Sequence, residues 1–199
     1  MPAFLFFYGG RKMKIREGIP EDADEAVYLM NLAIDEIGQA LTGEQEEEAI
    51  LEVMASFFKK KQNRLSHENT LVIEENSEII GVIVVYHGSE AEKLDWPLIE
   101  QVRLKSGNSD LLIDIESEPE DYYIDTVCVK PSYRGNRLGT TLIAEAEKRG
   151  RNLGYGRMSL NVEADNKGAR ALYQKLGYQK VGSKTIYGHS YDYMVKVMS

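Results

Sequence analysis

One stretch of the chain decides the fold: Val127-Cys-Val-Lys-Pro-Ser-Tyr-Arg134-Gly-Asn-Arg137-Leu-Gly139-Thr140. Its first residues continue a strand pattern, a proline ends that strand, and helical periodicity begins at Leu138. A helix N-terminus carries unpaired N–H groups and partial positive charge, so a strand–turn–helix unit of this kind binds anions. The glycines allow the backbone to approach an anion closely, and Arg134 and Arg137 add positive charge. The sequence therefore predicts a phosphate-binding turn at this position.

The spacing within this turn excludes two common phosphate-binding motifs. A P-loop requires G-x-x-x-x-G-K-[ST], and the stretch beginning at Gly135 has neither that spacing nor the lysine. The dinucleotide-binding pattern G-x-G-x-x-G is also missing. From the residues alone, a purely structural turn and a nucleotide-binding α/β protein both remain open as alternatives.

On either side of the turn, strand patterns alternate with helical ones. The β-branched runs 70–75 and 78–86 are joined through Asn76-Ser77, which predicts an antiparallel hairpin. We expect further strands at 14–16, 122–129, 157–162, 178–181 and 190–198, and helices at 21–37, 43–61, 138–149 and 166–176. No internal repeat or interdomain linker interrupts this pattern, so residues 13–199 read as a single mixed α/β domain.

Two segments depart from the alternation. Residues 1–12 contain the apolar run 4–8, which is too short to span a bilayer, and we interpret the segment as an N-terminal extension or a surface strand. Residues 87–121 form an acidic insertion, in which 94–104 has the periodicity of one amphipathic helix. The insertion is either a solvated surface element or an acidic lip that attracts a cationic substrate.

Charge and cysteine content narrow the class of protein. The chain has 24 Lys+Arg against 32 Asp+Glu, a net charge of −8, so it offers no basic patch for nucleic acid and favours cationic partners such as amines. No stretch is long and apolar enough to predict a membrane span. With Cys128 as the single cysteine, no intrachain disulfide can form, and a cytoplasmic setting is expected.

Two motifs together resemble the GNAT family of N-acetyltransferases. The run Arg134-Gly-Asn-Arg-Leu-Gly139 resembles that family's R/Q-x-x-G-x-G/A signature, and a second motif has Asn166, Ala169 and Tyr173 followed by Leu-Gly-Tyr178. Residues at i, i+3 and i+7 share one helical face. The resemblance implies a mixed α/β (α+β) fold, with a mostly antiparallel sheet of six to seven strands flanked by about four helices. It also implies direct transfer of an acetyl group from acetyl-CoA to a primary amine.

The resemblance extends to the residues that bind acetyl-CoA, although the signature departs from the family at one position. Arg137 stands where the first glycine usually falls, and a non-glycine residue fits there if the backbone is ordinary helical. The strand before the turn is expected to hydrogen-bond the pantetheine arm through its backbone. The implied cofactor-binding residues are Val127, Cys128, Val129, Arg134, Gly135, Asn136, Arg137, Leu138, Gly139, Thr140, Asn161, Asn166, Ala169 and Tyr173.

Catalytic roles follow from the same resemblance. Tyr173 is the expected general acid for the departing thiolate, although a tyrosine at this position could also simply pack in the core. Asp125 is the first candidate for the general base, with orientation of the amine as its other role; Asp121, Glu118 or a water chain are alternatives. By strand parity Asp125 should face the same side as Tyr123 and Val127. Asn166 fits a pantetheine contact or a helix N-cap equally well.

Other chemistries find little support in the sequence. Cys128 has apolar flanks and no histidine near it in sequence, so we expect a buried structural cysteine. The three histidines lack ligand spacing, and no metal site is assigned. A non-catalytic coenzyme A-binding sensor or interaction module is the alternative to an enzyme. Tyrosines of the closing strands (Tyr187, Tyr191 and Tyr193) could support a homodimer.

Overall fold

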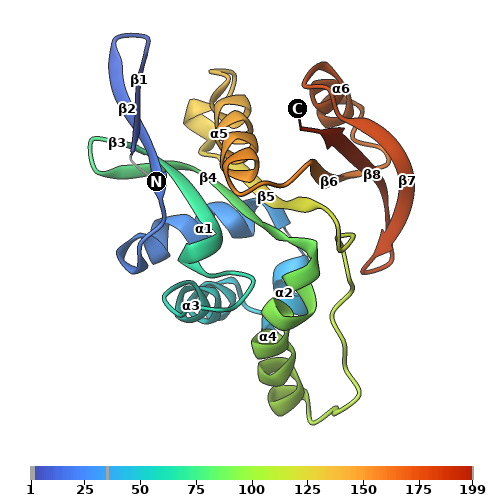
Figure 1. Ribbon diagram of the computed structural model, residues 1–199. Helices are drawn as coiled ribbons and strands as arrows, with labels where there is room; N and C mark the ends of the chain where they lie inside the picture. Colours follow the sequence, from blue (N-terminus) through green and yellow to red (C-terminus); the bar gives the residue numbers. More distant parts are fainter. Residues whose placement is uncertain (1–2, 35, 199) are drawn as a thin grey trace.

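The computed structural model describes residues 3–34 and 36–198, which form one twisted sheet with helices on both faces (Figure 1). The strands are β1 (Phe4–Tyr8), β2 (Arg11–Glu17), β3 (Thr70–Glu75), β4 (Glu78–His87), β5 (Tyr122–Val129), β6 (Arg157–Glu163), β7 (Gln179–Ile186) and β8 (His189–Val197). The α-helices are α1 (Ala23–Ile34), α2 (Ile37–Thr42), α3 (Glu47–Phe58), α4 (Ala91–Ser106), α5 (Leu138–Asn152) and α6 (Lys167–Lys175).

The sheet is mixed and mostly antiparallel, as the sequence predicted. Its strand order is β1-β2-β3-β4-β5-β6-β8-β7, and only β5 and β6 pair in parallel. The described residues contain eight strands and six α-helices, against the expected six to seven strands and about four helices. The additional strand is β1, which pairs with β2 from Phe4 to Tyr8, so the segment interpreted as an extension or surface strand continues the sheet. The additional helices are the short α2 and α4 of the insertion.

Two apolar layers cover the two faces of this sheet. One buried cluster lies between the sheet and α1–α4, and includes Phe58, Tyr86 and Tyr123. The other lies beneath α5 and includes Leu142 and Met158. Burying a large apolar side chain contributes roughly 1.5–3 kcal/mol, so these two layers hold α5 and α1 against opposite faces of the strands. No helix in the described part of the chain is long and apolar enough to cross a membrane.

A β-bulge at Asp125 changes which face of β5 each side chain uses. Val84 pairs with Thr126, whereas Val85 pairs with Ile124, so Asp125 is the extra residue opposite β4. Tyr123 consequently packs in the cluster of α1–α4, while Val127 contacts the cluster under α5. The expectation from simple alternation that Tyr123 and Val127 face the same side is therefore wrong.

Strands β5 and β6 separate after a short stretch of pairing. They are hydrogen-bonded only at the pairs formed by Tyr122, Tyr123 and Ile124. Beyond Ile124, β5 continues to pair with β4 as far as Val129, but within the described residues no strand lies along its other edge. The backbone of residues 125–129 therefore presents an open edge toward β6 and α6.

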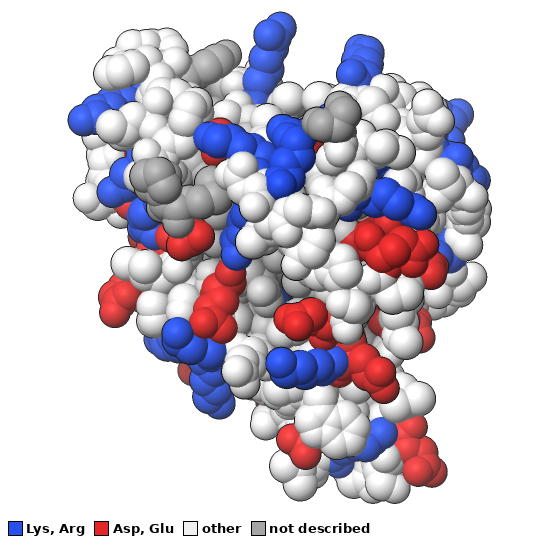
Figure 2. Space-filling model, viewed as in Figure 1, with Lys and Arg blue, Asp and Glu red and all other residues white. Residues whose placement is uncertain are grey.

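The insertion at residues 87–121 combines one helix with a long loop. The predicted amphipathic helix is confirmed as α4, which buries Leu94, Leu98 and Val102 against the other helices. Residues 107–121, called here the insertion loop, lack regular secondary structure and run beside β7 and β8 before entering β5 (Figure 1). Figure 2 shows a group of acidic side chains where this loop passes the two strands.

Candidate functional site

Two adjoining cavities lie where β5 and β6 separate. The larger, of about 560 Å³, is lined by both strands and by α1, α2 and α6. The smaller, of about 440 Å³, is lined by the end of β5, the turn after it, α5 and α6. Val127, Val129, Arg134 and Tyr173 line both of them. The two cavities therefore form a continuous cleft that runs from the start of α5 toward the helical layer of α1 and α2.

The start of α5 forms one wall of the smaller cavity. Within the predicted turn, its lining residues are Arg134, Gly135, Arg137, Leu138, Gly139 and Thr140. The first N–H groups of α5 have no carbonyl one turn earlier to accept from them, so they are free to bind an anion in this cavity. Gly135 has a left-handed backbone (φ +79°) that suits glycine. Asn136 lines neither cavity, and its amide instead donates to the Tyr133 carbonyl at 3.0 Å.

Arg137 has a strained backbone at the start of α5. It is the N-cap residue of this helix with φ +59° and ψ +12°, in the left-handed region. For an L-residue other than glycine this conformation costs roughly 1–2 kcal/mol. The condition under which a non-glycine residue fits without strain, an ordinary helical backbone, is therefore not met, and the glycine usual in the family would fit the observed conformation better.

This strain predicts a stabilising substitution. Arg137→Gly is expected to raise the free energy of unfolding by roughly 0.5–1 kcal/mol, because removing the left-handed penalty outweighs the added freedom of the unfolded chain. Urea denaturation measures the change. Arg137→Ala is the matched control, since it removes the same charge while leaving a Cβ in the left-handed region. Equal stability of the two variants would contradict the assignment of strain.

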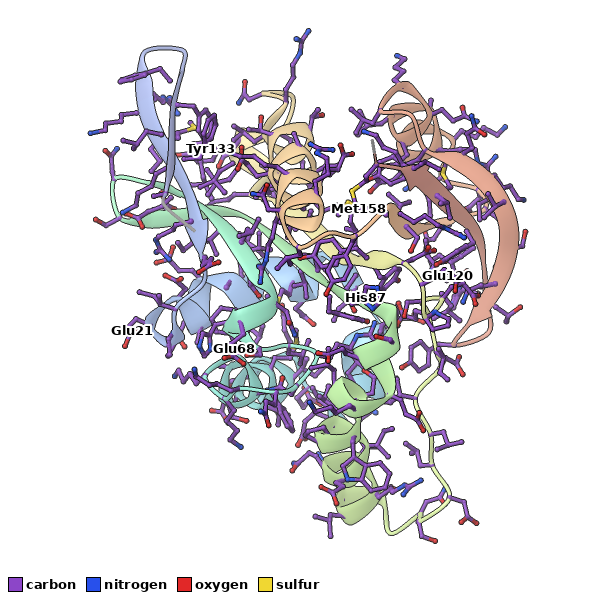
Figure 3. All side chains as sticks on the ribbon, viewed as in Figure 1. Glu21, Glu68, His87, Glu120, Tyr133 and Met158 are labelled. Atoms are coloured by element: carbon purple, nitrogen blue, oxygen red, sulfur yellow. The ribbon has the colours of Figure 1, made fainter. Side chains whose placement is uncertain are left out.

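The turn is anchored to the N-terminal strands through Tyr133. This residue lies between the β1–β2 hairpin and α5 (Figure 3). Its hydroxyl donates to Glu75 Oε2 at 2.6 Å, and the Arg11 guanidinium stacks over its ring with 5.8 Å between Cζ and the ring centroid. Tyr133 also lines the smaller cavity. The wall of the anion-binding turn is thus braced by β2 and β3.

Tyr173 lies at the junction of the two cavities. It projects from α6, and its ring packs edge-on against Tyr178 with 6.0 Å between centroids. Among the described residues, no group forms a hydrogen bond with its hydroxyl, which is therefore available to a bound molecule. Burial raises the pKa of Tyr173, so the phenol keeps its proton through neutral pH. The ring thus packs as a core tyrosine does, while its hydroxyl stays uncommitted.

The same helix brings the other residues of the second motif to the cleft. Asn166 caps α6, since its side-chain oxygen accepts from the Ala169 N–H at 3.0 Å. Both residues also line the larger cavity, so the capping role does not remove Asn166 from the site. Asn161, on β6, lines this cavity and donates to the hydroxyl of Tyr123 and the carbonyl of Glu116, at 3.0 Å in each case.

Asp125 lies at the floor of the larger cavity with its carboxylate fully hydrogen-bonded. Arg64 Nε donates to Oδ2 at 2.6 Å, the Tyr86 hydroxyl donates to the same oxygen at 2.8 Å, and the Thr126 hydroxyl donates to Oδ1 at 2.8 Å. Both oxygens of the carboxylate are thus engaged, which holds Asp125 in one orientation at the larger cavity.

Asp125 belongs to a buried group of charges centred on Arg64. The Arg64 side chain is 3% exposed and also pairs with Glu116, while its Nη1 lies 3.7 Å from Asp95 Oδ1. One guanidinium therefore faces three carboxylates. Burial raises the pKa of Asp95 from 3.8 to about 6, and burial likewise raises the pKa of Glu116. The floor of the cavity carries an excess of acidic groups.

Sequence patterns did not identify Arg64 or Glu116. Arg64 lies in an irregular segment after α3, and its partners are 61 and 52 residues away in sequence, so no local spacing links them. Glu116 comes from the insertion loop, where it was one acidic residue among many. The alternative bases Asp121 and Glu118 line neither cavity. Cys128 is buried, as expected, on the wall of the larger cavity.

Comparison with known proteins identifies the family. The model of the acetyltransferase (GNAT) family matches residues 34–178, most of the chain. This chain belongs to the acetyltransferase (GNAT) family. The resemblance inferred from Arg134–Gly139 and Asn166–Tyr178 is thereby confirmed. The match includes both cavity-lining motifs and the insertion, while Leu32, Ala33, Ile186 and Tyr191 of the larger cavity lie outside the matched range.

Individual relatives agree with this assignment. A crystal structure of an acetyltransferase is 30% identical, covers 93% of this chain and 99% of that one, and has a TM-score of 0.78. The N-acetyltransferase of Staphylococcus aureus Mu50 is 22% identical over 91% of this chain and 98% of that one, with a TM-score of 0.77, and shows the same fold.

Curated relatives match over a shorter region. A putative [ribosomal protein bS18]-alanine N-acetyltransferase of Bacillus subtilis (strain 168) is 37% identical over 68 residues, which are 34% of this chain and 45% of that protein. The matches span less than half the length of each curated relative. They therefore support a shared domain core, and they leave the acceptor of this chain to be inferred from its own cavity.

Proposed function

We propose that this protein transfers an acetyl group from acetyl-CoA to the nitrogen of a primary amine. The observation that carries the proposal is one continuous cleft that contains the open edge of β5, the free N–H groups at the start of α5, and Tyr173 where the two cavities join. A thioester of coenzyme A has a pyrophosphate and two amide groups, which match an anion-binding helix start followed by an unpaired strand edge.

The residues of the cleft fit coenzyme A in charge as well as in shape. Arg134 and Arg137 line the smaller cavity and would supply positive charge beside the pyrophosphate, while the helix start would supply N–H groups. Val127, Cys128 and Val129 line the larger cavity, and their backbone would pair with the amides of the pantetheine arm. Asn161, Asn166 and Ala169 form the opposite wall. When bound, the cofactor supplies the activated acetyl group.

Different residues of this chain would carry out the two proton transfers of the reaction. The amine nitrogen bonds to the carbonyl carbon as the carbon–sulfur bond breaks, and Tyr173 donates its phenolic proton to the departing thiolate. Glu116 is the cavity carboxylate proposed to accept a proton from the amine, because it lines the larger cavity and burial raises its pKa. Asp125, held in place by Arg64 and by the Tyr86 hydroxyl, orients the ammonium before that proton is lost.

A ligand series separates this proposal from its alternatives. Coenzyme A at 100 times its Kd stabilises a native state by about 2.7 kcal/mol, so its addition is expected to raise the Tm by several degrees, with no shift from ATP or NAD. Release of free thiol from acetyl-CoA in the presence of an amine then tests turnover. Stabilisation by ATP or NAD alone would indicate a nucleotide-binding protein, and stabilisation by coenzyme A without thiol release would indicate a non-catalytic module.

A further inference from the structure

Glu116 reaches the larger cavity from a segment without regular secondary structure. Among the described residues of the insertion loop, it is the one that lines this cavity. A carboxylate that takes a proton from a bound amine must be held in one position, and neighbouring side chains usually provide that support. The contacts that neighbouring strands make with Glu116 therefore bear directly on the proposed reaction.

The side-chain amide of Asn161 holds the backbone of Glu116. Asn161 lies on β6, and its Nδ2 donates to the Glu116 carbonyl oxygen and to the Tyr123 hydroxyl oxygen, at 3.0 Å in each case. The two N–H groups of the amide are thereby both used. Because a backbone carbonyl can only accept a hydrogen bond, the amide nitrogen and not the amide oxygen must face Glu116. The orientation of the Asn161 amide is thus fixed by its partners.

Tyr123 extends this contact to the carboxylate of Glu116. Its hydroxyl accepts from Asn161 and donates to Glu116 Oε2 at 2.9 Å, and the residue is buried, with 1% relative exposure. A hydroxyl that accepts one hydrogen bond is a stronger donor in the next, because the two bonds polarise each other. Arg64 donates to the other carboxylate oxygen. Asn161 therefore acts on Glu116 at two points, directly at the backbone and through Tyr123 at the side chain.

The same amide has no free group to offer to a cofactor. Both N–H groups of Asn161 are donated, and its Oδ1 is buried and accepts no hydrogen bond from any described residue. Asn166, on the same wall of the cavity, differs in this respect. Its oxygen caps α6, while its amide nitrogen forms no hydrogen bond within the described part of the chain. The geometry thus gives the two asparagines different tasks.

We propose that the side chain of Asn161 is a positioning residue for the proton acceptor Glu116, and that it is not a ligand of coenzyme A. This inference rests on the acetyl transfer proposed above, in which Glu116 takes the proton of the amine. Loss of the Asn161 amide would free the Glu116 backbone and weaken the hydrogen bond from Tyr123 to the carboxylate. Since that hydrogen bond lowers the pKa of Glu116, its weakening would raise this pKa.

Several other ionisable groups lie close enough to interact electrostatically with Glu116. They are Arg64 after α3, Asp95 of α4, Tyr86 of β4, Tyr123 and Asp125 of β5, Tyr187 at the β7–β8 turn and Tyr191 of β8. Burial raises the pKa of Glu116 and Arg64 opposes that rise, whereas Asp125 adds to it. Of these groups, Tyr123 is the one that hydrogen-bonds to Asn161 in the described structure, so substitution of Asn161 leaves the other groups in place.

The experiment compares the full-length wild type with Asn161→Ala at pH 6 and pH 8. Thiol release from acetyl-CoA gives kcat/KM for whichever acceptor the wild type uses fastest among 1,4-diaminobutane, free lysine and a hexapeptide that begins with a free alanine. We expect Asn161→Ala to lower kcat/KM by about tenfold or more at pH 8, because a misplaced reacting group slows the reaction strongly. The factor should be larger at pH 6, where more of the base is protonated. The Kd for coenzyme A should change by less than about threefold.

Two further variants test the route of the effect. Tyr123→Phe breaks the link between the same amide and the carboxylate, so it should lower kcat/KM with the same pH dependence and leave the Kd for coenzyme A unchanged. Tyr193→Phe is the matched control. The Tyr193 hydroxyl also holds the insertion loop, by accepting from the Glu118 N–H at 3.1 Å, but it forms no hydrogen bond with Glu116 among the described residues. This variant should keep the kcat/KM of the wild type at both pH values.

Four outcomes would overturn the inference while leaving acetyl transfer intact. They are an Asn161→Ala variant with the kcat/KM of the wild type, a loss of equal factor at pH 6 and pH 8, a Kd for coenzyme A that rises more than about tenfold, and an equal loss in Tyr193→Phe. A wild type that neither releases thiol nor is stabilised by coenzyme A would instead show that the proposed function itself is wrong.

Discussion

Replacing Arg64 by alanine is expected to lower the free energy of unfolding by about 3–5 kcal/mol, since removal of one partner from a buried ion pair leaves its counter-charges uncompensated. The Arg64 side chain is 3% exposed and is shared by Asp125, Glu116 and Asp95. Its backbone N–H also donates to the Leu94 carbonyl at 3.0 Å, which fixes the segment against α4. Urea denaturation at pH 8 measures this change in the free energy of unfolding.

The free energy of unfolding lost in Arg64→Ala should be smaller at low pH than at high pH. Burial raises the pKa of Asp95 from 3.8 to about 6 in the folded protein, so its protonated form is favoured by folding. The stability that this proton contributes is present below pH ~4 and is lost as the pH rises through about 6. Without Arg64, Asp95 and Glu116 lose the positive charge that lowers their pKa, so these two carboxyl groups take up protons at still higher pH. The variant is therefore expected to be closer to the wild type at pH 5 than at pH 8.

Two further substitutions make this result specific. Arg64→Lys keeps one positive charge but loses the planar fork that reaches several carboxylates, so it should fall between the wild type and Arg64→Ala. Arg151→Ala removes a partly exposed ion pair with Glu147 and should change stability by less than about 1 kcal/mol. The prediction would be contradicted if Arg64→Ala were as stable as Arg151→Ala at both pH 5 and pH 8. That result would show that Arg64 does not neutralise the three carboxylates around it.

The parts of the site that sequence predicted are those encoded by neighbouring residues. The hairpin at Asn76-Ser77, where both residues have positive φ, and the turn at residues 134–140 each depend on local backbone preferences that appear as short patterns. The helical spacing of Asn166, Ala169 and Tyr173 also placed all three residues on the cleft. In each case the residues of a single segment contain the pattern that predicts its structure.

The parts that sequence missed depend on pairing between distant segments. The bulge at Asp125 exists because β4 and β5 shift register, and no alternation within β5 alone reveals it. Arg64 and Glu116 meet only after the insertion loop has folded back beside β6. The left-handed backbone of Arg137 was also missed, because an arginine does not indicate a conformation that favours glycine. Contacts between distant segments thus determined the charged group at the larger cavity, whereas most of the turn before α5 and the residues of α6 followed from local patterns.

Substitution of Tyr173 by phenylalanine is expected to lower kcat by about 10²-fold or more, the usual contribution of a positioned general acid. Tyr173 lines both cavities, and its hydroxyl is free of protein hydrogen bonds among the described residues. Burial raises the pKa of Tyr173, so the phenol is protonated and able to donate throughout the assay range. Since the ring and its contact with Tyr178 remain, the Kd for coenzyme A should change by less than about threefold, which separates a chemical effect from lost binding.

Tyr178→Phe supplies the matched control for this prediction. Tyr178 is the ring neighbour of Tyr173, but its hydroxyl donates to Glu147 Oε1 at 3.1 Å inside the core and lines neither cavity. Its loss should cost about 1 kcal/mol of stability and leave kcat unchanged. The prediction would be contradicted if Tyr173→Phe kept kcat within about threefold of the wild type and had an unaltered pH profile. The leaving-group proton would then come from another donor, because loss of a positioned acid has a larger effect when chemistry limits turnover.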